Sequence, residues 1–350
     1  MTDIIKRTNL ERGFLMRQSR RFIFFVIFIF FVIIITNLPL NYYVYSPGTI
    51  ESLSPVVQVE SGYENEGDLH LVTVRGGQAT PLSLIPAIFS DYRDIHHMDD
   101  LFPEGYDRTS YMEAQLELME NSQEAAIVVA YQKAGEQIEI KYEGVYVVSV
   151  LEDMPAEEHL ETADKIIEVE GLPIIDAKHL VDTVDQYQVG DELTFLVERD
   201  EERFEVEIEL VPFIHDPDNF GIGIQLVTNR EVEIERQVTF ASGDIGGPSA
   251  GLIMALEIYN QLVEEDITNG LKIAGTGEID YDGYVSRIGG VDKKVVAADR
   301  ENCDIFFVPN EQGAPDSNYE VAKATAEDIG TDMEIVPVDH FEDALDYLQQ

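Results

Sequence analysis

The sequence predicts a chain of three parts: an apolar N-terminal helix, a small β-rich domain and a C-terminal α/β (α+β) domain. Three observations lead to this fold class. Residues 22–40 form an uncharged apolar run. Short strand-like runs surround one helix-like segment in residues 124–213, and residues 214–350 alternate between strand and helix patterns. A length of 350 residues allows each folded part to bury its own core.

The composition excludes several kinds of partner. Asp and Glu number 68 against 23 Lys and Arg, which gives a formal net charge of −45. A surface of this sign repels a phosphate backbone, so no nucleic-acid partner is expected. There is no HExxH motif and no Cys/His cluster, so we expect neither a metal nor another cofactor. Adaptation to high salt is one explanation of the acidity, and its cause stays open.

The N-terminal apolar run predicts a membrane anchor. At ~1.5 Å per residue, residues 22–40 would form a helix about 29 Å long, close to the thickness of a bilayer core. The 21 residues before it carry a net charge of +4, which favours the cytoplasmic side. We therefore expect a cytoplasmic N-terminus at 1–21, a transmembrane helix at 22–42 and an extracytoplasmic region at 43–123, in a single-pass protein of the cell membrane. A cleaved signal peptide is the alternative, but no small-x-small site follows the run.

Short strands around one helix characterise residues 124–213. A longer helix precedes them and begins at the capping box Ser110-x-x-Glu113. Asp176 is placed to cap the helix inside the segment. The strand-like runs on either side of that helix are Val145–Val148, Lys165–Val169 and Arg203–Leu210.

Residues 124–213 resemble a PDZ domain of the kind found in bacterial proteases. The resemblance lies in the stretches GVYVVSV, MPAEEHLETADKIIEVEGLPI and VGDELTFLVERD. In such domains an extended peptide adds as a strand beside a glycine-led loop and opposite a helix. The resemblance implies that the peptide-binding residues are Gly144, Val145, Tyr146 and Val147 on the loop, with His179 and Leu180 on the helix. The alternative is a β-rich spacer that binds no ligand.

Residues 214–350 show the alternation expected of an α/β domain. Pro248–Val263 and the segment after Val291 suit helices, and Lys272–Ile288 suits a hairpin. The later strands are expected at Ile305–Val308 and Met333–Val338, the later helices at 317–328 and after a cap at Asp339.

A glycine-rich stretch leads into the first helix of this domain. Residues 246–251 read GGPSAG, so Ser249 lies in the first helical turn, where free backbone N–H groups meet the positive end of the helix dipole. These groups favour a developing negative charge, so Ser249 is a candidate nucleophile. The backbone expected to form its oxyanion site is that of Gly247, Pro248 and Ala250. The alternative is a glycine-rich loop whose serine caps the helix.

The helix after Val291 supplies a candidate base. At about 100° per residue, Lys294 lies inside a narrow apolar stripe of this helix, whereas Lys293 lies on the opposite side. Burial lowers the pKa of a lysine, and a serine hydroxyl needs such a partner to act as a nucleophile. We therefore predict that Lys294 is the base and that Lys293 is solvated. The alternative is a Lys294 whose ammonium reaches water.

The same motifs closely resemble the proteolytic domain of Lon-type serine proteases. The stretches IGGPSAGL, AGTGEID and GYVSRIGGVDKKVVAA carry the resemblance, which extends from about residue 221 to the C-terminus. It implies a catalytic dyad of Ser249 and Lys294, with Thr276 of the TGE motif holding the lysine by a hydrogen bond. The Asp-Lys pair before the catalytic lysine departs from the Lys-Glu pair common there.

A missing motif separates the chain from cytosolic Lon. No G-x-x-x-x-G-K-[ST] phosphate loop occurs in the 350 residues, so no ATPase is expected. Anchor, PDZ-like segment (124–213) and Lon-like domain (214–350) together resemble the SepM/YlbL-like membrane-anchored proteases of Gram-positive bacteria. The resemblance implies an ATP-independent serine endopeptidase that cleaves secreted peptides or surface proteins outside the cell. It also implies that the PDZ domain presents peptide or unfolded protein, and it leaves room for a homo-oligomer. Strands between residues 50 and 80 would complete the proteolytic domain, with the PDZ domain as an insertion.

Two other functions fit parts of the sequence. The GPSAG stretch also matches the G-x-S-x-G elbow of α/β-hydrolases, which would make the chain an esterase with His340 as its base. An inactive second domain would instead leave a non-catalytic PDZ scaffold at the membrane. The presence of Ser249, Thr276 and Lys294 together favours the protease.

Overall fold

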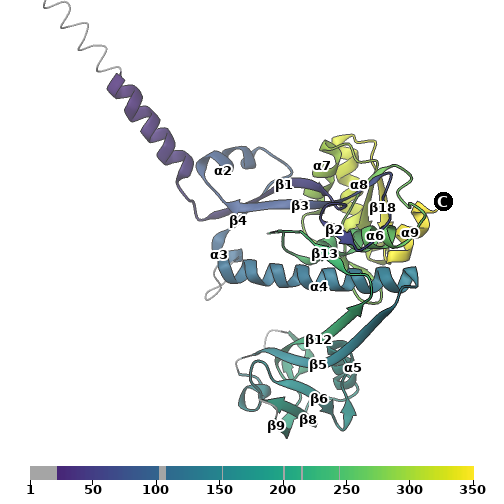
Figure 1. Ribbon diagram of the computed structural model, residues 1–350. Helices are drawn as coiled ribbons and strands as arrows, with labels where there is room; N and C mark the ends of the chain where they lie inside the picture. The colour runs from purple at the N-terminus through teal and green to yellow at the C-terminus, as the bar shows by residue number, and fades with distance from the viewer. Residues whose placement is uncertain (1–21, 102–107, 152, 200–201, 214–215, 244) are drawn as a thin grey trace, which may run out of the picture. The chain divides into compact units, whose positions relative to one another are not determined.

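The chain folds into two compact units, shown in the computed structural model of Figure 1. The described residues are 22–101, 108–151, 153–199, 202–213, 216–243 and 245–350. The α/β unit consists of the chain up to Glu136 together with Arg236–Gln350, and the β unit is Gln137–Glu235. The boundaries expected from the sequence, at 124 and 213, differ from these divisions.

The sheet of the α/β unit is assembled from both sides of the β unit. It has six strands in the order β18-β17-β14-β3-β1-β4. β3 (Asp68–Gln78) precedes the β unit in the sequence and pairs in parallel with β14 (Lys272–Gly275), which follows it. The β unit is therefore inserted into the α/β unit. The other strands of this sheet are β1 (Tyr42–Ser52), β4 (Asp94–His97), β17 (Ile305–Pro309) and β18 (Glu334–Val338).

Helices cover both faces of this sheet because strand side chains alternate between the faces. Phe306 of β17 belongs to a buried cluster with α7 and α8. The next residue, Phe307, faces the other way and meets the ring of Tyr347 in α9 at 5.8 Å between centroids. The helices are α6 (Gly251–Leu262), α7 (Val291–Arg300), α8 (Asn318–Ile329) and α9 (Phe341–Leu348).

The remaining elements of the α/β unit are short except for the helix at residues 22–37 and one other helix. The long helix α4 (Arg108–Ala134) packs against α6 (Figure 1). The short elements are α2 (Pro81–Ile88), α3 (Met98–Leu101), β2 (Val57–Val59), β13 (Val238–Phe240), β15 (Glu278–Ile279), β16 (Val285–Ser286), η2 (Pro248–Ala250) and η3 (Glu311–Gly313).

The cap of α9 lies one residue later than the sequence suggested. The N-cap is His340, whose ring accepts a hydrogen bond from the Glu342 amide. Asp339 cannot serve because its carboxylate accepts hydrogen bonds from the Gln312 amide at 2.8 Å and from the Asn310 side chain at 3.0 Å.

The β unit has its own sheet, in the order β12-β5-β6-β8-β9, with β7 paired to β6. α5 (Ala177–Val184) packs near β12 and is capped as predicted, because the Asp176 carboxylate accepts from the His179 amide at 2.6 Å. The other elements of the β unit are β5 (Ile138–Val150), η1 (Pro155–Glu158), β6 (Lys165–Val169), β7 (Leu172–Pro173), β8 (Glu192–Arg199), β9 (Glu202–Glu209), β10 (Val211–Phe213), β11 (Asp216–Gly221) and β12 (Ile224–Ile234).

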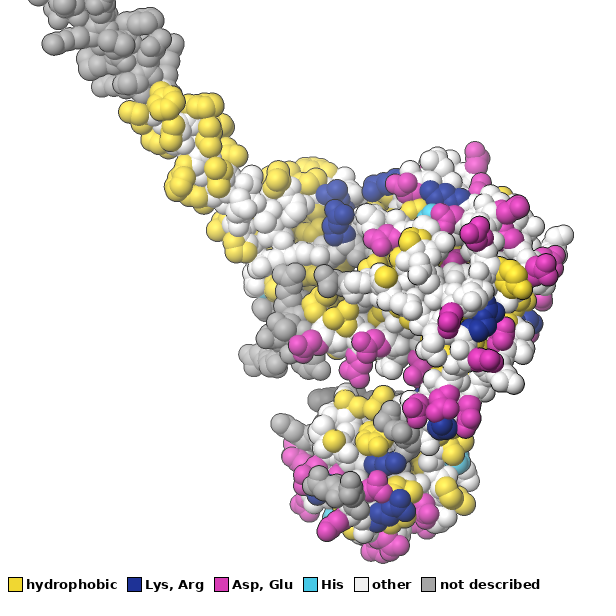
Figure 2. Space-filling view, viewed as in Figure 1, with side chains coloured by type: hydrophobic (Ala, Val, Ile, Leu, Met, Phe, Trp, Pro, Cys, Tyr) yellow, Lys and Arg dark blue, Asp and Glu magenta, His cyan; other side chains and the backbone are white. Residues whose placement is uncertain are grey.

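The predicted transmembrane helix needs correction. Residues 22–37 are helical with exposed apolar side chains, which form the yellow segment at the upper left of Figure 2. In the part of the chain that the structure describes, no helix combines the length and apolar character needed to cross a membrane. The prediction of a transmembrane helix over 22–42 is therefore wrong. The helix stops at residue 37 and Tyr42 already belongs to β1, where it pairs with His97 of β4. The predicted cytoplasmic segment 1–21 lies outside the described residues.

Candidate active site

Ser249 lies in the 3₁₀ turn η2, directly before α6. Gly247 begins the turn with φ of +94°, a conformation that glycine adopts without steric cost. The Ser249 carbonyl accepts hydrogen bonds from Thr276 Oγ1 at 3.0 Å and from the Gly277 amide at 2.9 Å. These two bonds fix the turn to the TGE segment.

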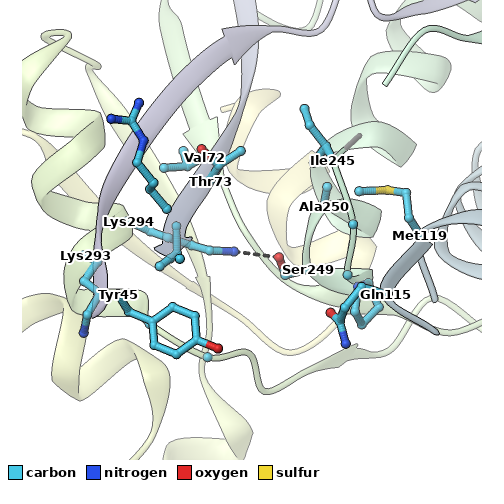
Figure 3. Close-up of a pocket in the computed structure, with 18 of the residues that line it drawn as sticks. Tyr45, Val72, Thr73, Gln115, Met119, Ile245, Ser249, Ala250, Lys293 and Lys294 are labelled. Carbon is cyan, nitrogen blue, oxygen red and sulfur yellow. Dashed lines mark hydrogen bonds between the residues drawn. The ribbon is translucent and has the colours of Figure 1, made fainter. Parts of the chain in front are cut away.

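Lys294 meets Ser249 inside the unit, as Figure 3 shows. Its Nζ is 2.6 Å from Ser249 Oγ and 2.8 Å from Thr276 Oγ1. Lys294 is only 3% exposed and Thr276 is fully buried. Burial lowers the pKa of Lys294 to about 7, because the charged form is desolvated. The structure thus brings together the three side chains that the sequence motifs singled out.

Lys293 is buried, not solvated as predicted. It is 2% exposed, and its ammonium forms ion pairs with Asp94 at 2.5 Å and Asp292 at 3.0 Å. Asp94 belongs to β4, which comes from the chain before the β unit. A helical projection of α7 alone could not include this partner, because β4 lies far from α7 in the sequence.

A cavity of about 770 Å³ opens beside Ser249. In Figure 3, Lys294 and Tyr45 lie on one side of Ser249, and Gln115 and Met119 of α4 on the other. The cavity walls combine aromatic and apolar side chains, such as Tyr43, Tyr111 and Met119, with charged ones, such as Glu51, Arg75 and Asp94. This volume lies within the usual range for ligand-binding pockets in proteins.

The expected oxyanion backbone is only partly in place. The Gly247 amide donates to the Gln115 carbonyl at 2.7 Å, so it is not free to bind an oxyanion. Pro248 has no N–H, and its carbonyl accepts from Ser122 Oγ at 2.8 Å. Ala250 lies within the 3₁₀ turn. Sequence reasoning missed Gln115 and Ser122 because both belong to α4. That helix was divided between the N-terminal region (43–123) and the PDZ-like segment (124–213), and not assigned to the proteolytic domain.

His340, the base of the esterase alternative, does not line the cavity beside Ser249. Its Nε2 is 2.9 Å from the Asp282 carbonyl, and its Nδ1 accepts from the Glu342 amide at 3.2 Å. Nδ1 therefore caps α9, and Nε2 contacts the turn between β15 and β16.

The β unit contains a second cavity, of about 360 Å³. It lies between α5 and the chain that enters β12, and β12 is an edge strand of its sheet. An edge strand has backbone groups that can pair with an added peptide strand. The residues that line this second cavity include Leu180, Val181, Phe220, Ile222, Gly223 and Leu226.

The expected peptide-binding loop lies elsewhere in this unit. Val145 and Val147 of β5 are core residues, 0% and 1% exposed. β5 pairs with β12 on one side, and Val145 and Tyr146 pair with β6 on the other, so this stretch has no edge for an added strand. The structure therefore does not place Gly144–Val147 beside this cavity, and their role in peptide binding stays a prediction. On the helix, Leu180 lines the cavity and His179 does not.

Instead, the glycine-containing stretch FGIG (residues 220–223) lines this second cavity, which forms a groove beside β12. The two glycines of this stretch are visible in the sequence. The stretch was missed because it follows residue 213, where the PDZ-like domain was expected to end.

Comparison with known families agrees with the geometry. Residues 219–350 match the Lon protease (S16) C-terminal proteolytic domain, and residues 115–210 match the PDZ domain. Residues 219–350 are thus similar to a Lon-type proteolytic domain. These matches support a proteolytic function acting on peptides or proteins.

Curated Lon proteases match about a third of the chain. The Lon protease of Aster yellows witches'-broom phytoplasma is 29% identical over 125 residues, 36% of this chain and 14% of that relative. The Lon protease of Clostridioides difficile is 34% identical over 100 residues, 29% of this chain and 12% of that relative. The chain thus spans less than a sixth of the length of either relative.

Two solved structures are similar to about a quarter of the chain. The PDZ domain of an SdrC-like protein from Listeria monocytogenes is 30% identical, covering 25% of this chain and 93% of its own, with a TM-score of 0.24. The solution structure of GtR34C from Geobacillus thermodenitrificans is 40% identical, covering 23% and 94%, with a TM-score of 0.22.

The family matches and the folded units end at different residues. The PDZ match begins at residue 115, within α4 of the α/β unit, and stops before β12. The Lon match begins at residue 219, within the β unit. Because β12 pairs with β5 from Ile224 to Ile234, it belongs to the PDZ fold and not to the proteolytic fold.

Proposed function

We propose that the chain is a serine endopeptidase that works without ATP, with Ser249 as nucleophile and Lys294 as general base. The observation that carries the proposal is the 2.6 Å contact between Lys294 Nζ and Ser249 Oγ in a buried site. A lysine whose pKa is about 7 is largely able to accept a proton near neutral pH. A serine hydroxyl gains nucleophilicity from such a base.

Thr276 prepares the amine for this role. Its hydroxyl donates to the Ser249 carbonyl at 3.0 Å, so an oxygen lone pair is left to accept from Lys294 Nζ at 2.8 Å. Directing one amine hydrogen to Thr276 leaves the nitrogen lone pair free to face Ser249 Oγ. Thr276 therefore orients the base, and it does not react.

Proton transfers through Lys294 complete the reaction. The amine takes the hydroxyl proton while Ser249 Oγ bonds to the scissile carbonyl carbon. The C–N bond then breaks, and the Lys294 ammonium returns the proton to the leaving amine. Water attacks the resulting ester with the same base, which releases the carboxyl product and regenerates the Ser249 hydroxyl.

The β unit supports a substrate of extended or unfolded chain. Its groove combines an edge strand, β12, with apolar side chains of α5 such as Leu180 and Val181. A peptide that pairs with β12 would place alternate side chains in this groove. Action outside the cell, on secreted peptides or surface proteins, is a further part of the proposal that rests on the SepM/YlbL-like resemblance alone.

Hydrolysis of an unstructured protein such as casein by the full chain tests the proposal. We expect cleavage without ATP, and a loss of about 10³-fold or more in both Ser249→Ala and Lys294→Met, because the two residues act as a unit. His340→Ala is the matched control and should cleave like the wild type. Equal cleavage by Ser249→Ala and the wild type would refute the peptidase, and loss of activity in His340→Ala alone would favour the esterase.

A further inference from the structure

The turn that carries Ser249 is held by α4, a helix outside the region that matches the Lon domain. The Gly247 amide donates to the Gln115 carbonyl at 2.7 Å. Ser122 Oγ donates to the Pro248 carbonyl at 2.8 Å. The residues directly before Ser249 are therefore bonded to α4, while the Ser249 carbonyl is bonded to the TGE segment.

The two contacts come from one face of α4. Gln115 and Ser122 are seven residues apart, about two helical turns, so they lie above one another on the helix. Met119 lies between them on this face, is 3% exposed and lines the cavity. In Figure 3, Gln115 and Met119 border the cavity on the side of Ser249 opposite Lys294.

Ser122 is packed too tightly to be an incidental contact. It is 3% exposed. A Cβ added to Gly251 would come within 2.6 Å of Ser122 Oγ, far inside van der Waals contact. Gly251, two residues after the nucleophile, is thus needed for the close approach of α4, and the Ser122 hydroxyl occupies the space that a Cβ would fill.

Two hydrogen bonds set the direction of the Ser249 amide: the Pro248 carbonyl accepts from Ser122 Oγ and, within η2, from the Gly251 N–H. The Pro248 carbonyl and the Ser249 N–H belong to the same planar peptide unit, in which they point in opposite directions when the bond is trans. No peptide bond in the described part of the chain is cis. Fixing the carbonyl toward Ser122 therefore turns the Ser249 N–H away from α4.

This amide belongs to the nucleophile itself and, with that of Ala250, is a backbone donor close to the site where the oxyanion forms. Gly247 is bonded to Gln115, and Pro248 has no N–H. We infer that Ser122 is a positioning residue that aligns the Ser249 N–H with the oxyanion formed during peptide hydrolysis. The inference rests on the proposed peptidase function. Because the bond is made before substrate arrives, the donor needs no rearrangement during the reaction.

Binding of a peptide boronic acid by the full chain tests this role. Such a compound bonds to a serine Oγ and presents a tetrahedral centre with an oxygen at the oxyanion site. For Ser122→Ala we expect about a tenfold loss in boronate affinity and in kcat, with KM within about twofold, since the lost interaction acts on the transition state. Ser122→Thr, which keeps the hydroxyl, should recover most of both.

A second buried serine provides the control for stability. Ser317 is fully buried, and its hydroxyl caps α8 by accepting from the Glu320 amide. Ser317→Ala should lower the melting temperature without changing boronate affinity. If Ser122→Ala does not fold, Ser122→Cys replaces it, because a thiol is a weak donor of similar shape.

The outcomes separate this inference from the proposed function. Ser122→Ala or Ser122→Cys that bound the boronate as tightly as an active wild type would overturn the inference alone. A loss in boronate affinity equal to that of Ser317→Ala would also overturn it. A wild type that neither cleaved peptide nor bound the boronate would overturn the proposed function and the inference with it.

Discussion

Lys294 owes its reactivity to burial among neutral groups. It is 3% exposed, and its Nζ contacts the hydroxyls of Ser249 and Thr276. Hydroxyls satisfy the amine with hydrogen bonds but supply no charge that would favour an ammonium. Desolvation therefore acts without compensation and lowers the pKa to about 7. One residue away, Lys293 is also buried, but two carboxylates balance its charge.

The pH dependence of hydrolysis should report this amine. Only neutral Lys294 can take the Ser249 proton, and the amine is protonated below its pKa. We therefore expect kcat/KM to rise as pH increases through about 7 and then to level off. Rates measured from about pH 5 to 9, with thermal unfolding recorded across the same range, check this. A flat profile in a folded enzyme would show that another group is the base.

The sequence could predict these residues where the information was local. Ser249 and Thr276 lie in short motifs, and the helical period placed Lys294 on the buried face. Lys293 was misplaced because its partner Asp94 comes from a strand on the other side of the insertion. Ser122 was missed for the same reason: nothing in its own sequence neighbourhood shows that it meets Pro248.

Among the elements, α7 is linked to the edge strand β4 of the six-stranded sheet by an ion pair. Lys293 of α7 reaches Asp94 of β4, the last strand of the six-stranded sheet. The strands and helices after residue 250 could be predicted from the sequence because their apolar runs and periodic patterns are local. The pairing of β3 with β14 could not, since it joins segments separated by the whole β unit.

Breaking this attachment from its two sides should have unequal effects on folding. Lys293→Met leaves Asp94 and Asp292, whose side chains are 49% and 26% exposed and can return to water. We expect it to cost under about 1 kcal/mol of the free energy of unfolding. The double variant Asp94→Asn/Asp292→Asn leaves a buried ammonium without countercharge and should cost about 3 kcal/mol. Urea denaturation at neutral pH compares them, and an equal or reversed order would contradict the argument.

In the whole molecule, the insertion leaves and re-enters the α/β unit at neighbouring points. Arg236 Nη1 forms an ion pair with Glu136 Oε1 at 3.0 Å, and the Arg236 carbonyl accepts a hydrogen bond from Tyr131. Within the β unit, the first and last strands pair so that Ile138 lies opposite Ile234. Such closeness is typical of inserted domains that fold independently. The two ends of the insertion are about 100 residues apart in the sequence, so their closeness in the fold cannot be read from the order of residues. The predicted domain boundaries at 124 and 213 therefore differ from those of the structure.

Replacing residues 137–235 with a short Gly-Ser linker should therefore leave a folded α/β unit. The ends to be joined are already held by the Glu136–Arg236 pair, so a short linker closes the gap at little entropic cost. We expect hydrolysis of short peptides within about threefold of the full chain, because Ser249, Thr276, Lys294 and Ser122 are all retained. Hydrolysis of long unfolded proteins should fall in kcat/KM, since the groove beside β12 is removed. Val181→Glu in the full chain places a charge in that groove. It should likewise lower kcat/KM for long unfolded proteins and leave the hydrolysis of short peptides unchanged. A shortened chain that folds but cleaves long proteins at the full rate would show that the β unit does not present substrate.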